Sequence, residues 1–176
     1  TWADPAPVAY GTALDGTHLN ATSDVPGTFI YDPSPGTVPD AGTHTLSTTF
    51  TPDDAANYET ATATVQLEVG SANQTIDFPA LPAKTYGDGP FAAGASASSG
   101  LAVSYSSSDA SVATVSGGAI TITGAGTADI TAQQGGDANW DAAADVTRTL
   151  TVAKATPVLT WADPAPVAYG TALDGT

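Results

Sequence analysis

The sequence predicts an all-β chain of antiparallel β-sandwich modules stacked end to end. Three observations lead to this prediction: a composition poor in helix formers, strands with alternating apolar residues, and a sequence that repeats. Thr, Ser, Val, Gly and Pro are abundant, whereas Met and Cys are absent. Sixteen of the eighteen acidic residues are Asp, which favours turns. Such a chain forms strands and turns more readily than helices.

The repeat sets the organisation of the chain. Residues 1–17 recur unchanged at 160–176, so the period is 159 residues. A weaker repeat lies within the period, where the motif Ala-Asn-Tyr at 56–58 is echoed by Ala-Asn-Trp at 138–140. Modules of about eighty residues can each bury a modest core. We therefore predict module A at 1–71, with an incomplete first strand, module B at 72–155, and the start of the next copy of module A at 156–176.

Apolar and polar residues alternate along the predicted strands. In module A this holds for residues 45–51 and for residues 61–69, where Ala61, Ala63, Val65, Leu67 and Val69 face one way. In module B it holds for 120–122 and 128–132, and Gly-rich turn signals separate the runs. Each module is expected to have about seven strands. The residues expected inside are Leu46, Phe50, Val65, Leu67, Ile120, Ile122, Ile130, Leu150 and Val152.

One stretch could instead form a helix. Residues 141–145 contain three alanines, which are good helix formers. Their alignment with residues 59–62, which lead into a strand, favours an approach to a strand. We therefore predict no helix in the chain.

The motifs of both modules resemble those of bacterial surface proteins. Module B reads VSYSSSDASVATVSGGAITITGAGTADITA at 103–132, which is similar to the bacterial immunoglobulin-like repeats of invasin and intimin type. Tyr105 stands where those repeats often carry Trp. Module A resembles the Gly- and Thr-rich Ig-like repeats of very large bacterial surface proteins, through Ala6–Leu14 and Thr51–Ala61. The resemblance covers essentially the whole chain and implies tandem Ig-like sandwiches in a surface array.

Charge and hydropathy exclude several partners. The net charge is −15, and the cations are Lys84, Arg148 and Lys154. Nucleic acid and anionic membrane surfaces both need a basic face, so neither is expected as a partner. No apolar run approaches ~18 residues, so direct membrane insertion is not expected. The sequence shows no signal peptide and starts at Thr1, so we interpret it as an internal piece of a longer protein.

Catalysis is not expected. The two histidines are His18, in a polar stretch after a turn, and His44, at the start of a strand; both are interpreted as surface or rim residues. No nucleophile elbow, zinc-protease or P-loop motif is present. Acidic pairs are frequent, but a catalytic pair needs a cleft that raises one pKa. We therefore predict that the chain is not an enzyme.

Calcium is the one cofactor that the sequence suggests. Asp137-x-Asn139-x-Asp141 copies the first half of an EF-hand loop, but Ala142 replaces the turn glycine and Arg148 the bidentate Glu, which excludes an EF-hand. A looser site remains, at Asp137, Asn139, Asp141 and Asp145, or at Asp53, Asp54, Asn57 and Glu59. The competing interpretation is that Asn57 and Asn139 cap turns while Tyr58 and Trp140 plug the ends of the sandwiches.

Together these features favour a shaft over a binder. We expect a structural repeat of an extracellular or cell-surface bacterial stalk, adhesin or filament, with a glycan- or protein-binding module as the alternative. Its partners would be neighbouring copies of the repeat, with lateral self-association into fibres, and one period would advance by ~70–80 Å. We also expect residues 160–176 to adopt the fold of 1–17 and to lie against the next copy, either in one continuous chain or by strand donation between subunits.

Overall fold

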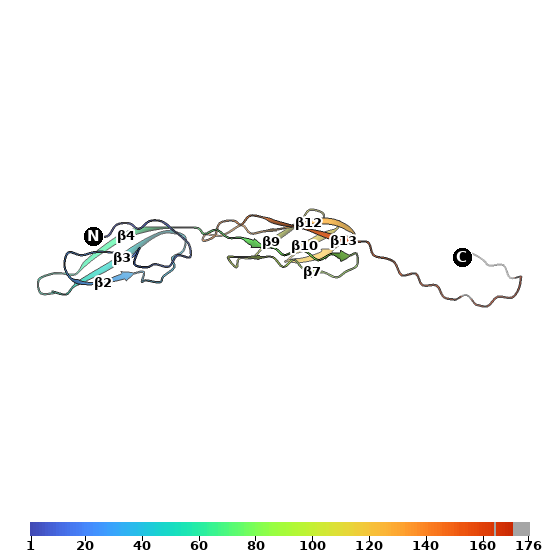
Figure 1. The fold of residues 1–176 in the computed structure, drawn as a ribbon, viewed down its shortest axis with the longest axis horizontal. Helices are drawn as coiled ribbons and strands as arrows, with labels where there is room; N and C mark the ends of the chain where they lie inside the picture. The colour runs from blue at the N-terminus through green and yellow to red at the C-terminus, as the bar shows by residue number, and fades with distance from the viewer. Residues whose placement is uncertain (164, 171–176) are drawn as a thin grey trace.

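The computed structural model describes residues 1–163 and 165–170, and these form an all-β protein. Two β-structured bodies follow one another along the long axis, and the chain after residue 155 leaves the second as an extended segment (Figure 1). The described residues contain no helix, so none of them forms a helix that could cross a membrane. Residues 141–145 are irregular rather than helical, as predicted.

The first body is built on one four-stranded sheet with the order β1-β4-β3-β2. Two long strands in the centre carry most of its pairing, because β3 and β4 are joined over nine residue pairs, from Gly42↔Val69 to Phe50↔Ala61. The strands are β1 (Val8–Ala9), β2 (Gly27–Asp32), β3 (Gly42–Pro52) and β4 (Ala61–Gly70).

The second body repeats this sheet and adds shorter strands. Its four-stranded sheet has the order β6-β13-β12-β9, and beside it lie a three-stranded sheet, β10-β11-β7, and a two-stranded one, β5-β8. The strands are β5 (Ile76–Asp77), β6 (Lys84–Thr85), β7 (Phe91–Ala92), β8 (Ser96–Ala97), β9 (Ser104–Ser107), β10 (Ala113–Ser116), β11 (Ala119–Ile122), β12 (Gly126–Gln133) and β13 (Val146–Ala153).

The sheets are not purely antiparallel, which differs from the prediction. β1 runs parallel to β4, and β6 runs parallel to β13. In each body the chain arrives at one end and leaves from the other (Figure 1). The first and last strands therefore run in the same direction, and they must be parallel when they are neighbours.

The number of strands also differs from the prediction of about seven. In the described part, module A has the four strands β1–β4, and module B has the nine strands β5–β13. Module A covers its sheet with irregular chain instead of a second set of strands. Leu14 and Leu19, from that irregular segment, are 1% and 7% exposed and pack with Leu46 and Leu67.

The predicted interior is mostly confirmed. Eight of the nine residues are buried, and Ile122 is half-buried at the edge of the second core. β7 pairs only with Ala119 and Ile120, so it ends before it covers Ile122. One core lies within residues 2–69 and the other within 76–152. The boundaries at 71/72 and 155/156 stay a prediction.

Two of the five residues predicted to share one face of β4 are exposed. Val65, Leu67 and Val69 alternate inward as predicted, whereas Ala61 and Ala63 are solvent-exposed. They lie where β4 begins, at the end of module A that is farthest from module B (Figure 1).

The second copy of the 17-residue motif does not share the fold of the first. Trp2 is half-buried and Val8 lies in β1, but Trp161 is 92% exposed and Val167, the counterpart of Val8, is 58% exposed and in no strand. In the described part of the chain, no strand equivalent to β4 lies beside residues 165–170. Within this single copy these residues do not share the local fold of 1–17, and the expectation that they adopt it against the next copy stays a prediction; positions 164 and 171–176 lie outside the described residues.

Candidate functional site

The best-defined polar and aromatic site lies at the junction between the two modules. The chain crosses from β4 into module B through Ser71 and Ala72, and Ala72 pairs with Trp140 in a parallel β-bridge. Ala72 N–H donates to Asn139 O, and Asp141 N–H donates to Ala72 O, both at 2.9 Å. The connecting chain is therefore fixed to the loop between β12 and β13.

Asn139 joins the two modules through its side-chain amide. Its Oδ1 accepts a hydrogen bond from Ala41 N–H at 2.7 Å, and its Nδ2 donates to Asp40 Oδ1 at 3.0 Å. Asp137 holds the loop in shape, because its Oδ1 accepts from the backbone N–H groups of Asn139 and Trp140 at 2.8 and 2.9 Å. The side-chain amide of Asn139 therefore forms hydrogen bonds with both the backbone and a side chain of module A.

An aromatic pair covers the same junction. The rings of Tyr10 and Trp140 meet edge to face, with centroids 5.6 Å apart and planes at 80°, and both residues are half-buried. This is the favoured geometry for aromatic pairs. Gly136 permits the loop: its φ is +76°, and a Cβ there would lie 2.2 Å from Trp140 O. Any side chain at residue 136 would displace Trp140.

Further hydrogen bonds anchor the loop behind the junction. Ser71 Oγ donates to Asp141 Oδ1 at 2.5 Å. The buried Gln74 uses its Nε2 to donate to Asp141 O at 2.7 Å and to Gln134 Oε1 at 2.6 Å. The bonds of Gln74 hold the loop within module B, whereas the bond of Ser71, like the two of Asn139, crosses to module A and orients one module on the other.

The four predicted calcium ligands have separate partners in the structure. Asp137 caps the loop, Asn139 binds module A, Asp141 accepts from Ser71, and Asp145 Oδ2 accepts from Gln133 Nε2 at 2.7 Å. Among the described residues, no group of three or more His, Cys, Asp or Glu side chains could hold a metal ion. Calcium binding at these residues stays a prediction.

The alternative acidic loop lies at the opposite end of module A. There Asn57 Nδ2 donates to Asp54 Oδ2 at 2.8 Å, and Tyr58 N–H donates to Asp54 O at 3.0 Å. Asn57 therefore stabilises its own turn. Tyr58 is 50% exposed, unlike its counterpart Trp140, so the tyrosine does not plug the end of module A.

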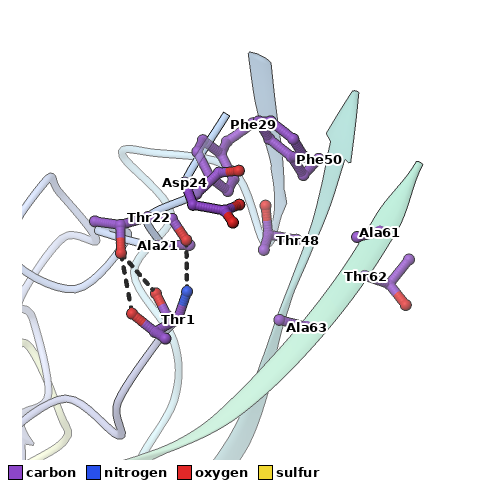
Figure 2. A pocket seen from close by; sticks show the side chains of 11 residues that line it. Thr1, Ala21, Thr22, Asp24, Phe29, Thr48, Phe50, Ala61, Thr62 and Ala63 are labelled. Atoms are coloured by element: carbon purple, nitrogen blue, oxygen red, sulfur yellow. Dashed lines mark hydrogen bonds between the residues drawn. The ribbon is translucent and has the colours of Figure 1, made fainter. Parts of the chain in front are cut away.

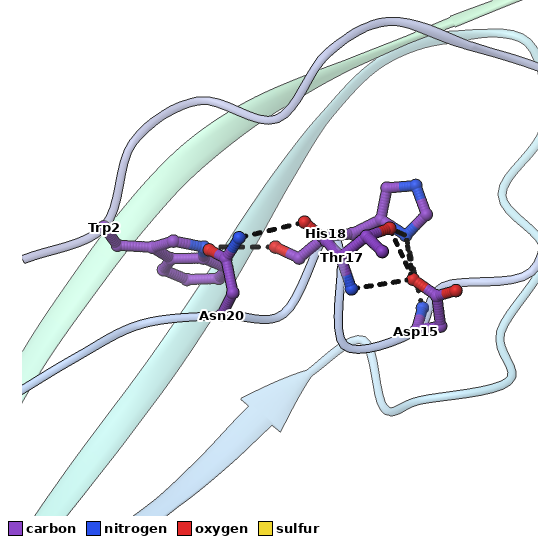
Figure 3. Close-up of polar contacts among 5 residues, drawn as sticks. All are labelled: Trp2, Asp15, Thr17, His18 and Asn20. Carbon is purple, nitrogen blue, oxygen red and sulfur yellow. Dashed lines mark hydrogen bonds and ion pairs between the residues drawn. The ribbon is translucent and has the colours of Figure 1, made fainter.

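A second polar cluster holds a turn of module A (Figure 3). Asp15 Oδ1 accepts from the hydroxyl of Thr17 at 2.6 Å and from its N–H at 2.9 Å, and Trp2 Nε1 donates to His18 O at 3.1 Å. The hydroxyl of Thr17, then its N–H, lowers the pKa of Asp15. His18 is 8% exposed, so the expectation of a surface or rim residue is wrong.

A turn of module B with the same hydrogen bonds explains why His18 is buried. Asp109 Oδ1 accepts from the hydroxyl and N–H of Ser111 at 2.6 and 2.9 Å, which lowers the pKa of Asp109 in the same way. The residue after Ser111 is Val112, which is 5% exposed in the core. The turn itself directs the next side chain inward, whatever its polarity.

The cluster of Asp15, Thr17 and His18 does not have the geometry of a catalytic triad. In a triad the histidine stands between acid and hydroxyl, with one ring nitrogen on each. Here Asp15 bonds Thr17 directly, and both residues approach the same nitrogen, Nδ1 of His18, at 2.8 and 3.3 Å. The arrangement stabilises a turn and does not activate the hydroxyl.

An open groove of about 640 Å³ lies beside Thr1 (Figure 2). Phe29 and Phe50 form one wall, with ring centroids 4.8 Å apart, and Ala61 and Ala63 from β4 lie on the other side. Thr1 is hydrogen-bonded to Thr22 at the rim, and Thr48 lies at the base (Figure 2). The two exposed alanines of β4 therefore line this groove.

The comparisons with known proteins identify no family for this chain. No protein-family model matches the sequence, and no curated protein is similar to it. A similar solved structure is the EC1–4 segment of Drosophila N-cadherin, with 13% identity and a TM-score of 0.31. The match covers 88% of this chain and 50% of that one, so the chain spans about half the length of the cadherin structure.

Proposed function

We propose that the chain is a structural repeat that forms the shaft of an extracellular bacterial stalk, adhesin or surface filament. The observation that carries the proposal is the junction of the two modules. Asn139, Trp140 and the bridge at Ala72 fix module B to the end of module A, while the chain arrives at one end of each module and leaves at the other. Modules joined in this way add length in one direction.

The surface chemistry fits such a role. A net charge of −15 keeps neighbouring shafts soluble and apart, and it disfavours nucleic acid as a partner. Bridging by cations would allow the shafts to associate laterally into fibres. The turn cluster at Asp15 is structural in this proposal, and the chain carries no catalytic step.

The experiment measures length against copy number. Proteins with one, two and three periods are compared by small-angle X-ray scattering, and the maximum dimension should rise by a constant ~70–80 Å for each period. A dimension that rises far less than this would mean that the modules fold back on one another, and would refute the shaft.

A second candidate function is a binding module of an adhesin, for a glycan or a protein. The groove beside Thr1 favours it, because aromatic and hydroxyl side chains line an open surface there. A glycan array and a pull-down with the chain distinguish the two functions. Binding that is lost on Phe29→Ala would support the adhesive module.

A further inference from the structure

Backbone hydrogen bonds show which residue of module B holds the place of Tyr10. Tyr10 N–H donates to Gly70 O at 2.7 Å, and Tyr86 N–H donates to Ala153 O at 2.8 Å. Both tyrosines follow the short strand that pairs parallel with the last strand of their module. Tyr10 meets Trp140 at the internal junction, whereas Tyr86 is 53% exposed at the far end of module B.

The loop that would receive Tyr86 is present at the other end of the repeat. Tyr58 follows Ala-Asn, as Trp140 does, and precedes the last strand of its module. It is 50% exposed, and it lies in the loop between β3 and β4, which forms the end of module A that points away from module B (Figure 1). The two ends of the period therefore carry the two halves of the aromatic pair that is complete at the internal junction.

Opposite charges occupy the flanking positions. Lys154 follows Ala153 as Ser71 follows the equivalent Gly70, so Lys154 corresponds to Ser71. Glu59 follows Tyr58 as Asp141 follows Trp140, so Glu59 corresponds to Asp141. At the internal junction those places are joined by the hydrogen bond from Ser71 Oγ to Asp141 Oδ1. At the ends of the period the same places hold a cation and an anion with longer side chains.

The groove beside Thr1 fits the chain that precedes the second copy of the motif. Ile76 stands two residues before Phe78, and Leu159 stands two residues before Trp161, the counterpart of Phe78. Ile76 is buried in the core of module B, but Leu159 is 92% exposed. The groove thus corresponds to a site that module B fills with its own first strand.

The strand register gives the same correspondence. Gly42 and Gly126 pair with the equivalent residues Val69 and Val152, which aligns β3 with β12. In this alignment, the groove residues Phe29, Thr48 and Ala63 hold the places of Val103, Ala132 and Val146. In module B the residues at those places pack in one core with Ile76.

We propose that module B of one copy docks on module A of a second copy of this repeat, in the same way as module A docks on module B within the period. Tyr86 packs against Tyr58, Lys154 pairs with Glu59, and Leu159 fills the groove beside Thr1 of the second copy. The proposal rests on the proposed shaft and names its partner surface. Every junction of the array then has the same aromatic contact, and every second junction also has an ion pair.

The test uses a two-copy protein, in which residues 1–159 are followed directly by residues 1–176. The chain has no cysteine, so a disulfide reports only on an introduced pair. Lys154→Cys in the first copy and Glu59→Cys in the second should form a disulfide under mild oxidation. The pair Ser71→Cys and Asp141→Cys is the positive control, and Lys154→Cys with Glu68→Cys is the negative control. Failure of the first pair to close while the positive control closes would overturn the proposal, as would equal closure of the negative control.

A second measurement uses the unaltered side chains. Carbodiimide joins a lysine directly to a carboxylate that it contacts, so mass spectrometry of the two-copy protein should identify a Lys154–Glu59 peptide between the copies. Its absence, with other lysine–carboxylate peptides present, would count against the ion pair.

Leu159 tests the groove independently. In the two-copy protein, Leu159→Asn in the first copy should lower the melting temperature by roughly 5–10 °C, because a buried apolar contact is lost in a small module. The same substitution in the single chain is the matched control, and it should change nothing, since Leu159 is exposed there. Equal melting temperatures of the two-copy protein with and without Leu159→Asn would refute the filling of the groove.

Small-angle scattering of the same protein separates this proposal from the shaft. An extended particle whose cysteine pair stays open would refute the docking contacts and leave the shaft standing. A particle with two copies folded side by side would refute the shaft itself.

Discussion

Replacement of Asn139 by Ala should loosen the junction between the modules without unfolding either of them. The substitution removes two hydrogen bonds to module A, from Ala41 N–H at 2.7 Å and to Asp40 Oδ1 at 3.0 Å. A typical intramolecular hydrogen bond contributes about 0.5–1.5 kcal/mol net. Since the contact with Asp40 is solvent-exposed, we expect the coupling between the modules to fall by about 1–2 kcal/mol.

Hydrogen exchange at Ala41 measures this loss directly, because its N–H is the donor to the side chain of Asn139. A change of about 1–2 kcal/mol corresponds to an exchange roughly 5–30 times faster. Amides in the centre of β4 should keep their protection, since Leu67 remains in an intact core. Asn57→Ala is the matched control: it removes the equivalent amide at the other end of module A and should leave Ala41 unaffected. Unchanged exchange at Ala41 in Asn139→Ala would refute the role of the amide.

Three further predictions concern stability, pH and metal. Leu46→Ala should lower the free energy of unfolding by about 2–5 kcal/mol in urea, because Leu46 is fully buried, whereas Ile30→Ala, at a side chain 67% exposed, should change it little. Thr17→Val should raise the pKa of Asp15 in an NMR titration, and an unchanged titration would contradict this. Because the folded-state pKa of Asp15 is lowered, its carboxylate stabilises the fold above the unfolded-state pKa, and this stabilisation is lost as pH falls through the folded-state pKa. The variant should therefore lose less stability on acidification. If calcium binds the loop at Asp137, excess calcium should raise the melting temperature above that in EDTA, and identical melting curves would remove the metal site.

The alternation of apolar residues predicted the strands because β-structure has a period of two and each module buries one face. Leu46, Leu67, Ile130 and Leu150 are all fully buried for that reason. The sequence did not reveal that module A replaces a second sheet by irregular chain. Leu14 and Leu19 follow no alternating pattern, so nothing in their spacing indicates that they cover a sheet.

The junction was harder to predict than the cores. Asn139 and Asp141 were identified from oxygen-ligand spacing, which is common to cation sites and to capped turns. Their real partners, Ala41 and Ser71, are about 100 and 70 residues away in sequence. The residues around Asn139 alone do not indicate a contact with another module. The signal that could have indicated it is the recurrence of an Asn-aromatic motif before the last strand of each module.

If the chain forms the proposed shaft, the parallel pairing of its first and last strands would let each module carry load. Tension along the array pulls β1 toward one end of module A and β4 toward the other, and the two strands are joined at Val8↔Val69, Ala9↔Gly70 and from Tyr10 N–H to Gly70 O. Hydrogen bonds between parallel strands pulled in opposite directions lie across the load and must break together, whereas a hairpin opened from its turn loses them one at a time. Tyr10 adds the aromatic contact with Trp140 at the end of the same pairing, so the residue that closes β1 also fixes the next module. In the proposed shaft, resistance to pulling and the direction of the next module would thus depend on the same few residues.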